Sequence, residues 1–430
     1  MKVISDLGPY PAEAGYEEAL AADADDPLSG HRLRYVSTDP SLIYLDGNSM
    51  GRLPQAARGL IDDVVQRQWA DRLIRSWNEG WWDLQLELGN LVAPLIGATP
   101  GEVIISDSTS VNLFKLATAA VRARPGRHTI VTDDLNFPGD VYVMAGIASL
   151  IGDGCRLVVV ESDGIHGPVD ALAEAIDSDT ALVSLSHTSF MSGYTYDLAA
   201  ITRAAHDAGA LMLWDLSHSV GAVPIDLESS GADLAVGCTY KYLNGGPGAP
   251  AFLYVRSGLQ TVLENPITAW WGHLDPFAMD LEFVPVDGIR RFHTGTMPIV
   301  SLAAIEAGIT DVAEAGIEAI RAKSILLSEY LISLWETHLE ELGFTIASPR
   351  DPARRGSHVA LSHLEGWPIT RALIDGASVI PDFRAPDTLR LGLSPLYTSF
   401  LDVHTAILRL KRVVERDLYE DYRHVSLTVT

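Results

Sequence analysis

Apolar and polar positions follow two different patterns along residues 100–255. Short continuous apolar runs, typical of buried strands, are separated by stretches in which apolar residues recur every three or four positions, as on one face of a helix. Continuous apolar strands with helices between them indicate an α/β fold with a mostly parallel central sheet and helices on both faces. The predicted strands are 102–106, 128–132, 156–160, 181–186, 211–215, 234–239 and 251–255, and the predicted helices include 111–123, 169–176 and 198–208.

The pattern changes after residue 298. A helical stretch from 299 to about 342 is followed by strand-like runs and an amphipathic helix, which together predict a smaller α+β domain. Residues 1–50 are rich in Asp, Pro and Gly, so we expect an irregular arm that wraps against another part of the molecule. A chain of 430 residues favours two domains. The predicted division is an arm (1–50) that joins the small domain, a large cofactor-binding domain (51–298), and a linking helix with the C-terminal small domain (299–430), whose expected elements are 344–346, 358–361, 388–393 and 401–418.

The charge balance limits the partners of the chain. Its 31 Lys and Arg against 56 Asp and Glu leave a net charge of −25. Nucleic acids and anionic membranes both require a basic face, so neither is an expected partner. Two cysteines form no disulfide framework, the N-terminal residues resemble no secretion signal, and no apolar run is long enough to cross a bilayer. We therefore expect a cytoplasmic protein that acts on a small molecule, and we predict no metal site.

One of the five lysines differs from the others in its surroundings. Lys2 is terminal, and Lys115, Lys323 and Lys411 lie in helical patterns, where a solvated charge is expected. Lys241 instead follows an apolar run and precedes a glycine-rich turn. A lysine at the end of a buried strand is costly unless it is paired, neutralised or covalently used.

An acidic residue ends a second apolar run 26 positions earlier. Asp215 follows 210–214, and in an α/β sheet both residues would lie at the carboxyl ends of strands, where ligands bind. A lysine that forms a Schiff base and an aspartate that pairs with a pyridinium nitrogen are the two parts of a pyridoxal phosphate site. The alternatives are a structural role for Lys241 and a helix N-cap for Asp215. His218, three residues on, would lie above such a cofactor or reach its phosphate.

Other segments provide weaker signals for the same site. The hydroxyl groups and free backbone N–H groups of 107–113 could hold a phosphate, although an ordinary helix cap has the same composition. Phe137 either stacks on a planar ring or belongs to the core. The aromatic loops 269–273 and 292–298 fit packing or a subunit interface. Arg384 and Arg390 are candidate clamps for a substrate carboxylate, and Arg390 lies within an apolar, strand-like run.

Taken together, these segments resemble kynureninase, a pyridoxal phosphate enzyme of the aspartate-aminotransferase fold type (fold type I). The similarity extends over nearly the whole chain, and the combination is specific although each piece is weak. The matching segments are 44–51, 75–78, 107–113, 136–140, 214–218, 239–246, 270–273, 295–299 and 382–397.

The resemblance implies a role for each residue of the site. Lys241 would carry the cofactor as a Schiff base, Asp215 would pair with its pyridine nitrogen, and Tyr240 would donate a proton during catalysis. The other cofactor-binding residues would be Thr109, Ser110, Phe137, Asp140, Ser186, His218, Trp270 and Thr296, and the substrate-binding residues would be Ser49, Trp77, Asn78 and Arg390. Trp270 and Thr296 resemble contacts lent by a second subunit, so a homodimer with a shared active site is expected.

The implied reaction is hydrolysis of the Cβ–Cγ bond of L-kynurenine, 3-hydroxykynurenine or both. The products would be anthranilate, or its 3-hydroxy form, and L-alanine. A transaminase, a desulfurase and a non-catalytic cofactor-binding protein are the alternatives. A desulfurase requires a nucleophilic cysteine on a mobile loop, and no cysteine follows Cys238.

Overall fold

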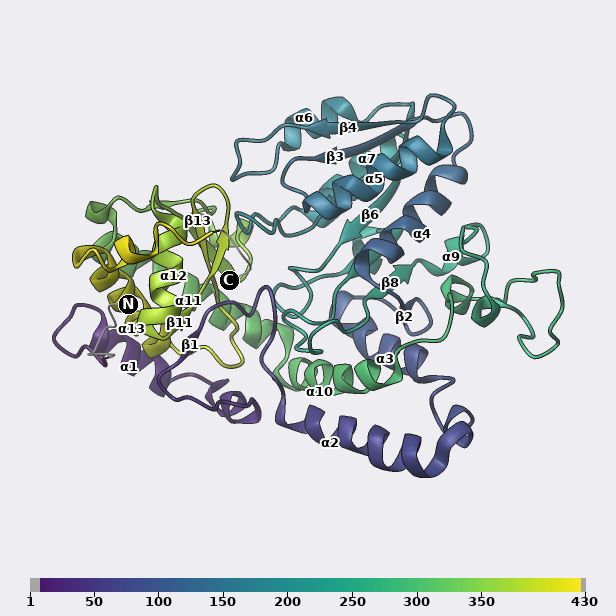
Figure 1. Ribbon diagram of the computed structural model, residues 1–430. Helices are drawn as coiled ribbons and strands as arrows, with labels where there is room; N and C mark the ends of the chain where they lie inside the picture. The colour runs from purple at the N-terminus through teal and green to yellow at the C-terminus, as the bar shows by residue number, and fades with distance from the viewer. Residues whose placement is uncertain (1–7, 427–430) are drawn as a thin grey trace.

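The computed structural model describes residues 8–426 and consists of a larger and a smaller body (Figure 1). The larger body contains a seven-stranded sheet with the order β2-β8-β7-β6-β5-β3-β4, in which β8 alone among the described strands runs against the rest. The predicted α/β fold with a mostly parallel sheet is confirmed. The strands are β2 (Val103–Ile105), β3 (Thr129–Asp133), β4 (Arg156–Val160), β5 (Thr180–Ser186), β6 (Leu211–Asp215), β7 (Leu234–Gly237) and β8 (Phe252–Val255).

Alternate residues of each strand enter two hydrophobic clusters, one on each face of the sheet. In β6, Leu211 and Leu213 pack in the cluster that includes α4 and α5, whereas Met212 and Trp214 pack in the cluster that includes α3, α7 and α10. Every strand of the sheet centre is thus buried on both sides, which explains its continuous apolar sequence. The helices of this body are α2 (Gln55–Asp63), α3 (Leu84–Val92), α4 (Thr109–Arg122), α5 (Pro138–Ile151), α6 (Val169–Ala175), α7 (Leu198–Asp207), α8 (Leu227–Ser230), α9 (Ser257–Gln260) and α10 (Ile299–Ala315).

The smaller body is an antiparallel sheet, β12-β13-β10-β9, with helices packed on it and its own hydrophobic cluster. The N-terminal arm joins it, because β1 pairs in parallel with β11 and α1 packs on α13. The elements are α1 (Tyr16–Ala24), β1 (Ile43–Tyr44), α11 (Ile317–His338), β9 (Thr345–Ile346), β10 (His358–Ser362), α12 (Gly366–Ala377), β11 (Val379–Ile380), β12 (Asp382–Arg384), β13 (Thr388–Gly392) and α13 (Phe400–Glu415).

Two expectations about secondary structure are wrong. The arm is not irregular throughout, since α1 is a helix whose Asp23 accepts hydrogen bonds from the first backbone N–H groups of α13. Residues 1–7 of the expected arm lie outside the described residues. The expected continuous helix from 299 is two helices, because the backbone of Gly316 has φ 79° and ends α10. The exact domain boundaries stay a prediction.

Two lysines that were expected in solvent are buried. Lys115 is fully buried in α4 and pairs with Asp107 at 2.7 Å. Lys323 in α11 pairs with Asp26 of the arm at 2.7 Å. Both were predicted as solvated because a helical pattern does not reveal which polar position faces a partner across the interior. Within residues 8–426, no helix combines the length and the apolar character needed to span a bilayer.

Candidate active site

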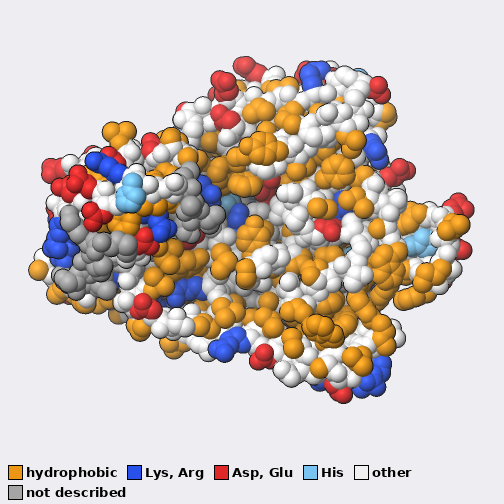
Figure 2. Space-filling view, viewed as in Figure 1, with side chains coloured by type: hydrophobic (Ala, Val, Ile, Leu, Met, Phe, Trp, Pro, Cys, Tyr) orange, Lys and Arg blue, Asp and Glu red, His pale blue; other side chains and the backbone are white. Residues whose placement is uncertain are grey.

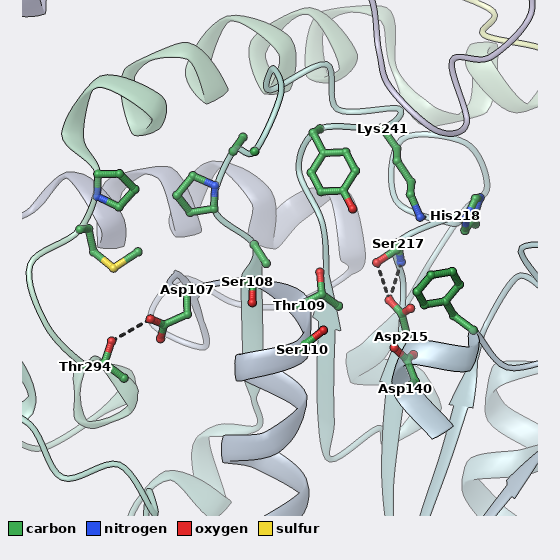
Figure 3. Close-up of a pocket in the computed structure, with 18 of the residues that line it drawn as sticks. Asp107, Ser108, Thr109, Ser110, Asp140, Asp215, Ser217, His218, Lys241 and Thr294 are labelled. Carbon is green, nitrogen blue, oxygen red and sulfur yellow. Dashed lines mark hydrogen bonds between the residues drawn. The ribbon is translucent and has the colours of Figure 1, made fainter. Parts of the chain in front are cut away.

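A cavity of about 550 Å³ lies at the carboxyl ends of the parallel strands, where the fold predicts a ligand (Figure 3). Its walls come from the segments that follow β2, β3, β6 and β7, and from a loop that precedes α10. Nine of the predicted site residues line this cavity: Thr109, Ser110, Phe137, Asp140, Asp215, His218, Tyr240, Lys241 and Thr296.

Lys241 projects into the cavity from the turn after β7 (Figure 3). Its Nζ lies 2.8 Å from Nε2 of His218. Burial, together with the charge of Lys241, holds the pKa of His218 well below its usual range, so the imidazole is neutral. A neutral ring that accepts from the lysine at Nε2 carries its proton on Nδ1, and this buried atom has no partner among the described residues.

Two carboxyl groups face each other on the other side of the cavity. Asp215 ends β6, and its Oδ1 accepts hydrogen bonds from the backbone N–H and the hydroxyl of Ser217, at 2.8 and 2.6 Å. Asp140 lies in the first turn of α5 beside Asp215. Burial and the neighbouring charge raise the pKa of Asp140 well above its usual range. Asp140 therefore keeps its proton at neutral pH.

The third wall is the first turn of α4, which begins at Thr109 after the cap residue Ser108. Backbone N–H groups at the start of a helix, with hydroxyl side chains beside them, form an anion site. Asp107 precedes this turn in the left-handed region at φ 47°, held by Lys115. Its other oxygen accepts a hydrogen bond from Thr294 at 2.8 Å, which ties the loop before α10 to this wall (Figure 3).

These three walls fit pyridoxal phosphate. An amine and a carboxyl group face one cavity, and an anion site lies beside them. Two buried polar atoms, His218 Nδ1 and Asp140 Oδ2, have no partner among the described residues. Phe137 is 44% exposed and lines the cavity, so the core alternative for this ring is wrong.

Comparison with known proteins identifies the family that the sequence resembles. The family model described as Kynureninase C-terminal domain matches residues 320–410. The kynureninase of Pseudomonas fluorescens is 44% identical over 404 residues, which cover 93% of this chain and 95% of that protein. The chain belongs to the kynureninase family.

Solved structures at lower identity share the fold of this kynureninase family member. A cysteine desulfurase from Thermococcus onnurineus NA1 matches with a TM-score of 0.76 at 20% identity, over 92% of this chain and 98% of its own. A C-DES mutant with glycine covalently linked to its PLP cofactor matches with a TM-score of 0.73 at 17% identity, over 86% and 97%. The expected pyridoxal phosphate fold is confirmed.

Several predicted residues of the kynureninase site do not line the cavity. Ser186 is the register partner of Asp215, and its hydroxyl donates to Asn136 at 2.6 Å. Arg390 is fully buried in β13 and binds the hydroxyl of Ser49 at 3.0 Å. Their predicted roles stay predictions.

Two predicted aromatic residues, Trp77 of the substrate site and Trp270 of the cofactor site, belong to a separate cluster of tryptophans. Trp77 packs edge-on against Trp271, while Trp270, which is 43% exposed, packs on Trp82. Asn78 is exposed and follows Trp77. The assignment of Trp270 and Thr296 to a second subunit stays a prediction.

Two residues that lie beside Asp215 and His218 were not predicted from the sequence. Ser217 fixes Asp215, and its position two residues after an aspartate is the spacing of an Asx turn, a signal that the sequence does contain. His358 comes from β10 of the smaller body, and its ring packs against His218 with centroids 5.9 Å apart. No local pattern could have revealed it, because its partner lies 140 residues away.

Proposed function

We propose that this chain hydrolyses the Cβ–Cγ bond of L-kynurenine, or of its 3-hydroxy form, to L-alanine and the corresponding anthranilate. The observation that carries the proposal is the position of Lys241 and Asp215 on the lining of one cavity. The 44% identity to a kynureninase over almost the full length supports the same activity.

The chain's own groups supply the proton transfers. The bound pyridoxal phosphate would act as an electron sink for the carbanion formed at the substrate. Asp215 would pair with the pyridine nitrogen of the bound cofactor and favour its protonated form, and Asp140 lies beside Asp215 with its own proton retained. Lys241 moves the proton at the substrate α-carbon, with its Nζ oriented by the neutral His218.

Tyr240 is the proposed proton donor to Cβ, the carbon that stays with the alanine product when the bond to Cγ breaks. Interaction with the Cys238 thiol, together with burial, raises the pKa of Tyr240, so the phenol keeps its proton at neutral pH. Its hydroxyl lines the cavity next to Lys241. A phenol in this position can give its proton to a carbanion that forms within the cavity.

A homodimer and a cytoplasmic location complete the proposal. The loop from His273 to Pro285 projects from the larger body and presents Leu274, Phe277, Met279 and Leu281 to solvent (Figure 2). A contiguous apolar surface of this kind is typical of a protein–protein interface. Both cysteines are free thiols, which fits a reducing compartment. Leu281→Glu is expected to shift the mass measured by light scattering from dimer to monomer; an unchanged dimer would exclude this loop from the interface.

One fold relative is a cysteine desulfurase, but the thiols of this chain do not favour that activity. Cys238 is buried, and burial raises the pKa of its thiol, which opposes nucleophilic use. Cys155 precedes β4, at the amino end of the strands and away from the cavity. Neither thiol is available to the substrate.

The test is to add kynurenine and 3-hydroxykynurenine separately to the protein loaded with pyridoxal phosphate. We expect release of anthranilate fluorescence and of alanine, and the ratio of the two kcat/KM values would define the substrate. Lys241→Ala is the matched control and is expected to lose both turnover and the visible absorbance of the bound cofactor. Normal visible absorbance without either product would favour a transaminase or a non-catalytic protein.

A further inference from the structure

Arg390 lies in a closed network of polar contacts outside the cavity lining. Its Nε donates to Oδ2 of Asp382 at 2.5 Å, and its Nη2 contacts the same oxygen and the hydroxyl of Ser49. Its Nη1 donates to the backbone carbonyl of Phe190. Of the five N–H groups of the Arg390 guanidinium, four are thus engaged and one on Nη1 has no partner among these contacts. The contacts fix the plane of the guanidinium.

Asp382 is the one carboxylate in that network that contacts the guanidinium directly. It is the register partner of Arg390 across the β12–β13 pair, so the two side chains leave the sheet on the same face. Asp382 is 3% exposed, and the same oxygen lies 3.0 Å from Nε of Arg384, two residues along β12. One carboxylate thus holds two arginines.

The network is linked to the cavity by one packing contact and by the charge of Arg390. Phe190, whose carbonyl binds Arg390, packs edge-on against Phe137 of the cavity wall with centroids 5.3 Å apart. The charge of Arg390 also contributes to the low pKa of His218, another residue of the lining. A buried arginine whose charge reaches the site can hold an anionic substrate group only if its own orientation is maintained.

We propose that Asp382 is a positioning residue that orients Arg390 toward the α-carboxylate of the substrate and keeps Arg384 beside it. The inference rests on the proposed function, because it assumes an amino-acid substrate. Asp382 is not part of the cavity lining, so its effect on binding would act through the arginines.

The experiment measures carboxylate recognition without using turnover. L-Alanine and ethylamine differ only by the carboxylate, and each is titrated into the cofactor-loaded protein while the visible absorbance is recorded. In Asp382→Asn we expect the preference for L-alanine over ethylamine to fall on the order of tenfold or more, because a charge-assisted contact to the guanidinium is lost. The KM for kynurenine should rise by a similar factor while kcat changes less than about threefold. Asp382→Glu should restore part of the preference.

Asp375→Asn is the matched control. It removes the carboxylate of an ion pair with Arg371 on α12, in the same small body but away from Arg390, and should leave the preference unchanged. An unchanged preference in Asp382→Asn would overturn the inference, and so would an equal loss of affinity for both amines. If Asp382→Asn does not fold, Asp382→Ser, which also removes the carboxylate, carries the same comparison, and a wild-type preference in that variant would overturn the inference. A wild-type protein that does not distinguish the two amines would instead contradict the proposed function.

Discussion

A single methyl group at position 308 should displace the lysine-bearing turn. Gly308 lies in α10, and a Cβ atom on it would be 1.9 Å from the carbonyl oxygen of Leu243, two residues after Lys241. A tolerable contact begins at about 3.0 Å, so the turn or the helix must move by roughly 1 Å. Overpacking of this kind costs about 1–3 kcal/mol, and the better helix propensity of alanine offsets about 1 kcal/mol of that.

We therefore expect Gly308→Ala to lower the free energy of unfolding by no more than about 2 kcal/mol. The effect on catalysis should be larger, because a misplacement of about 1 Å at a reacting group costs on the order of 100-fold in kcat. The assay combines urea unfolding, the visible absorbance of the bound cofactor and anthranilate release. Gly146→Ala is the matched control, since Gly146 is exposed on α5 with no atom near its missing Cβ.

The control variant should gain about 1 kcal/mol of stability and keep its activity. Wild-type kcat and wild-type cofactor absorbance in Gly308→Ala would refute the reasoning, because they would mean that the turn around Lys241 adapts without moving the amine. If the loss of activity in Gly308→Ala were no larger than the loss of folded protein accounts for, the substitution would act on overall stability and not by displacing the turn around Lys241.

Three further outcomes are expected. Burial raises the pKa of Asp133 to about 6, so the native protein binds this proton more tightly than the unfolded chain and loses stability as pH rises from about 4 to 6. Asp133→Asn should therefore be more stable than wild type by about 2–3 kcal/mol at pH 7.5 and by almost nothing at pH 4, and an equal difference at both would contradict this. A thiol reagent should label Cys155 in the native protein and Cys238 only after unfolding, because Cys238 is 1% exposed; two rapidly labelled thiols would be inconsistent with the structure. Lys115→Met should lower stability by about 3 kcal/mol in urea unfolding, since it leaves the Asp107 carboxylate without its cation, and unchanged stability would exclude that ion pair as a stabilising contact.

The strands of the sheet and the residues at their carboxyl ends could be predicted because the sequence patterns that indicate them are local. Apolar runs with abrupt ends gave two strands, 156–160 and 211–215, with the bounds that the structure has. Asp215 could be assigned because strand ends face one edge of a parallel sheet. The shift of Lys241 to a turn four residues after the end of β7 did not matter, because the turn folds back toward the same edge.

What the sequence did not reveal depends on contacts between distant segments. The antiparallel direction of β8 follows from its pairing with β2 and β7, and an apolar run has no direction of its own. The burial of Lys115 and Lys323 arises because Asp107 and Asp26 come from other elements and meet the ammonium groups in the interior. Hydrophobic periodicity identifies the apolar face of a helix, but it does not show which lysine of that helix pairs with a carboxylate from another element.

The position of the Lys241 amine depends on segments that are distant in the sequence. The turn after β7 is held from the segment that follows the arm, where the N–H of Gly51 donates to the carbonyl of Tyr240 at 2.8 Å. A Cβ on Gly51 would lie 2.4 Å from the carbonyl of Lys241, and one on Gly308 would meet Leu243 from the side of α10. The two glycines are more than 250 residues apart, yet both are needed to let backbone approach the same turn. The amine is therefore placed by the packing of the segment around Gly51 and of α10 around the turn, and the geometry of Lys241 depends on both segments as much as on its own strand.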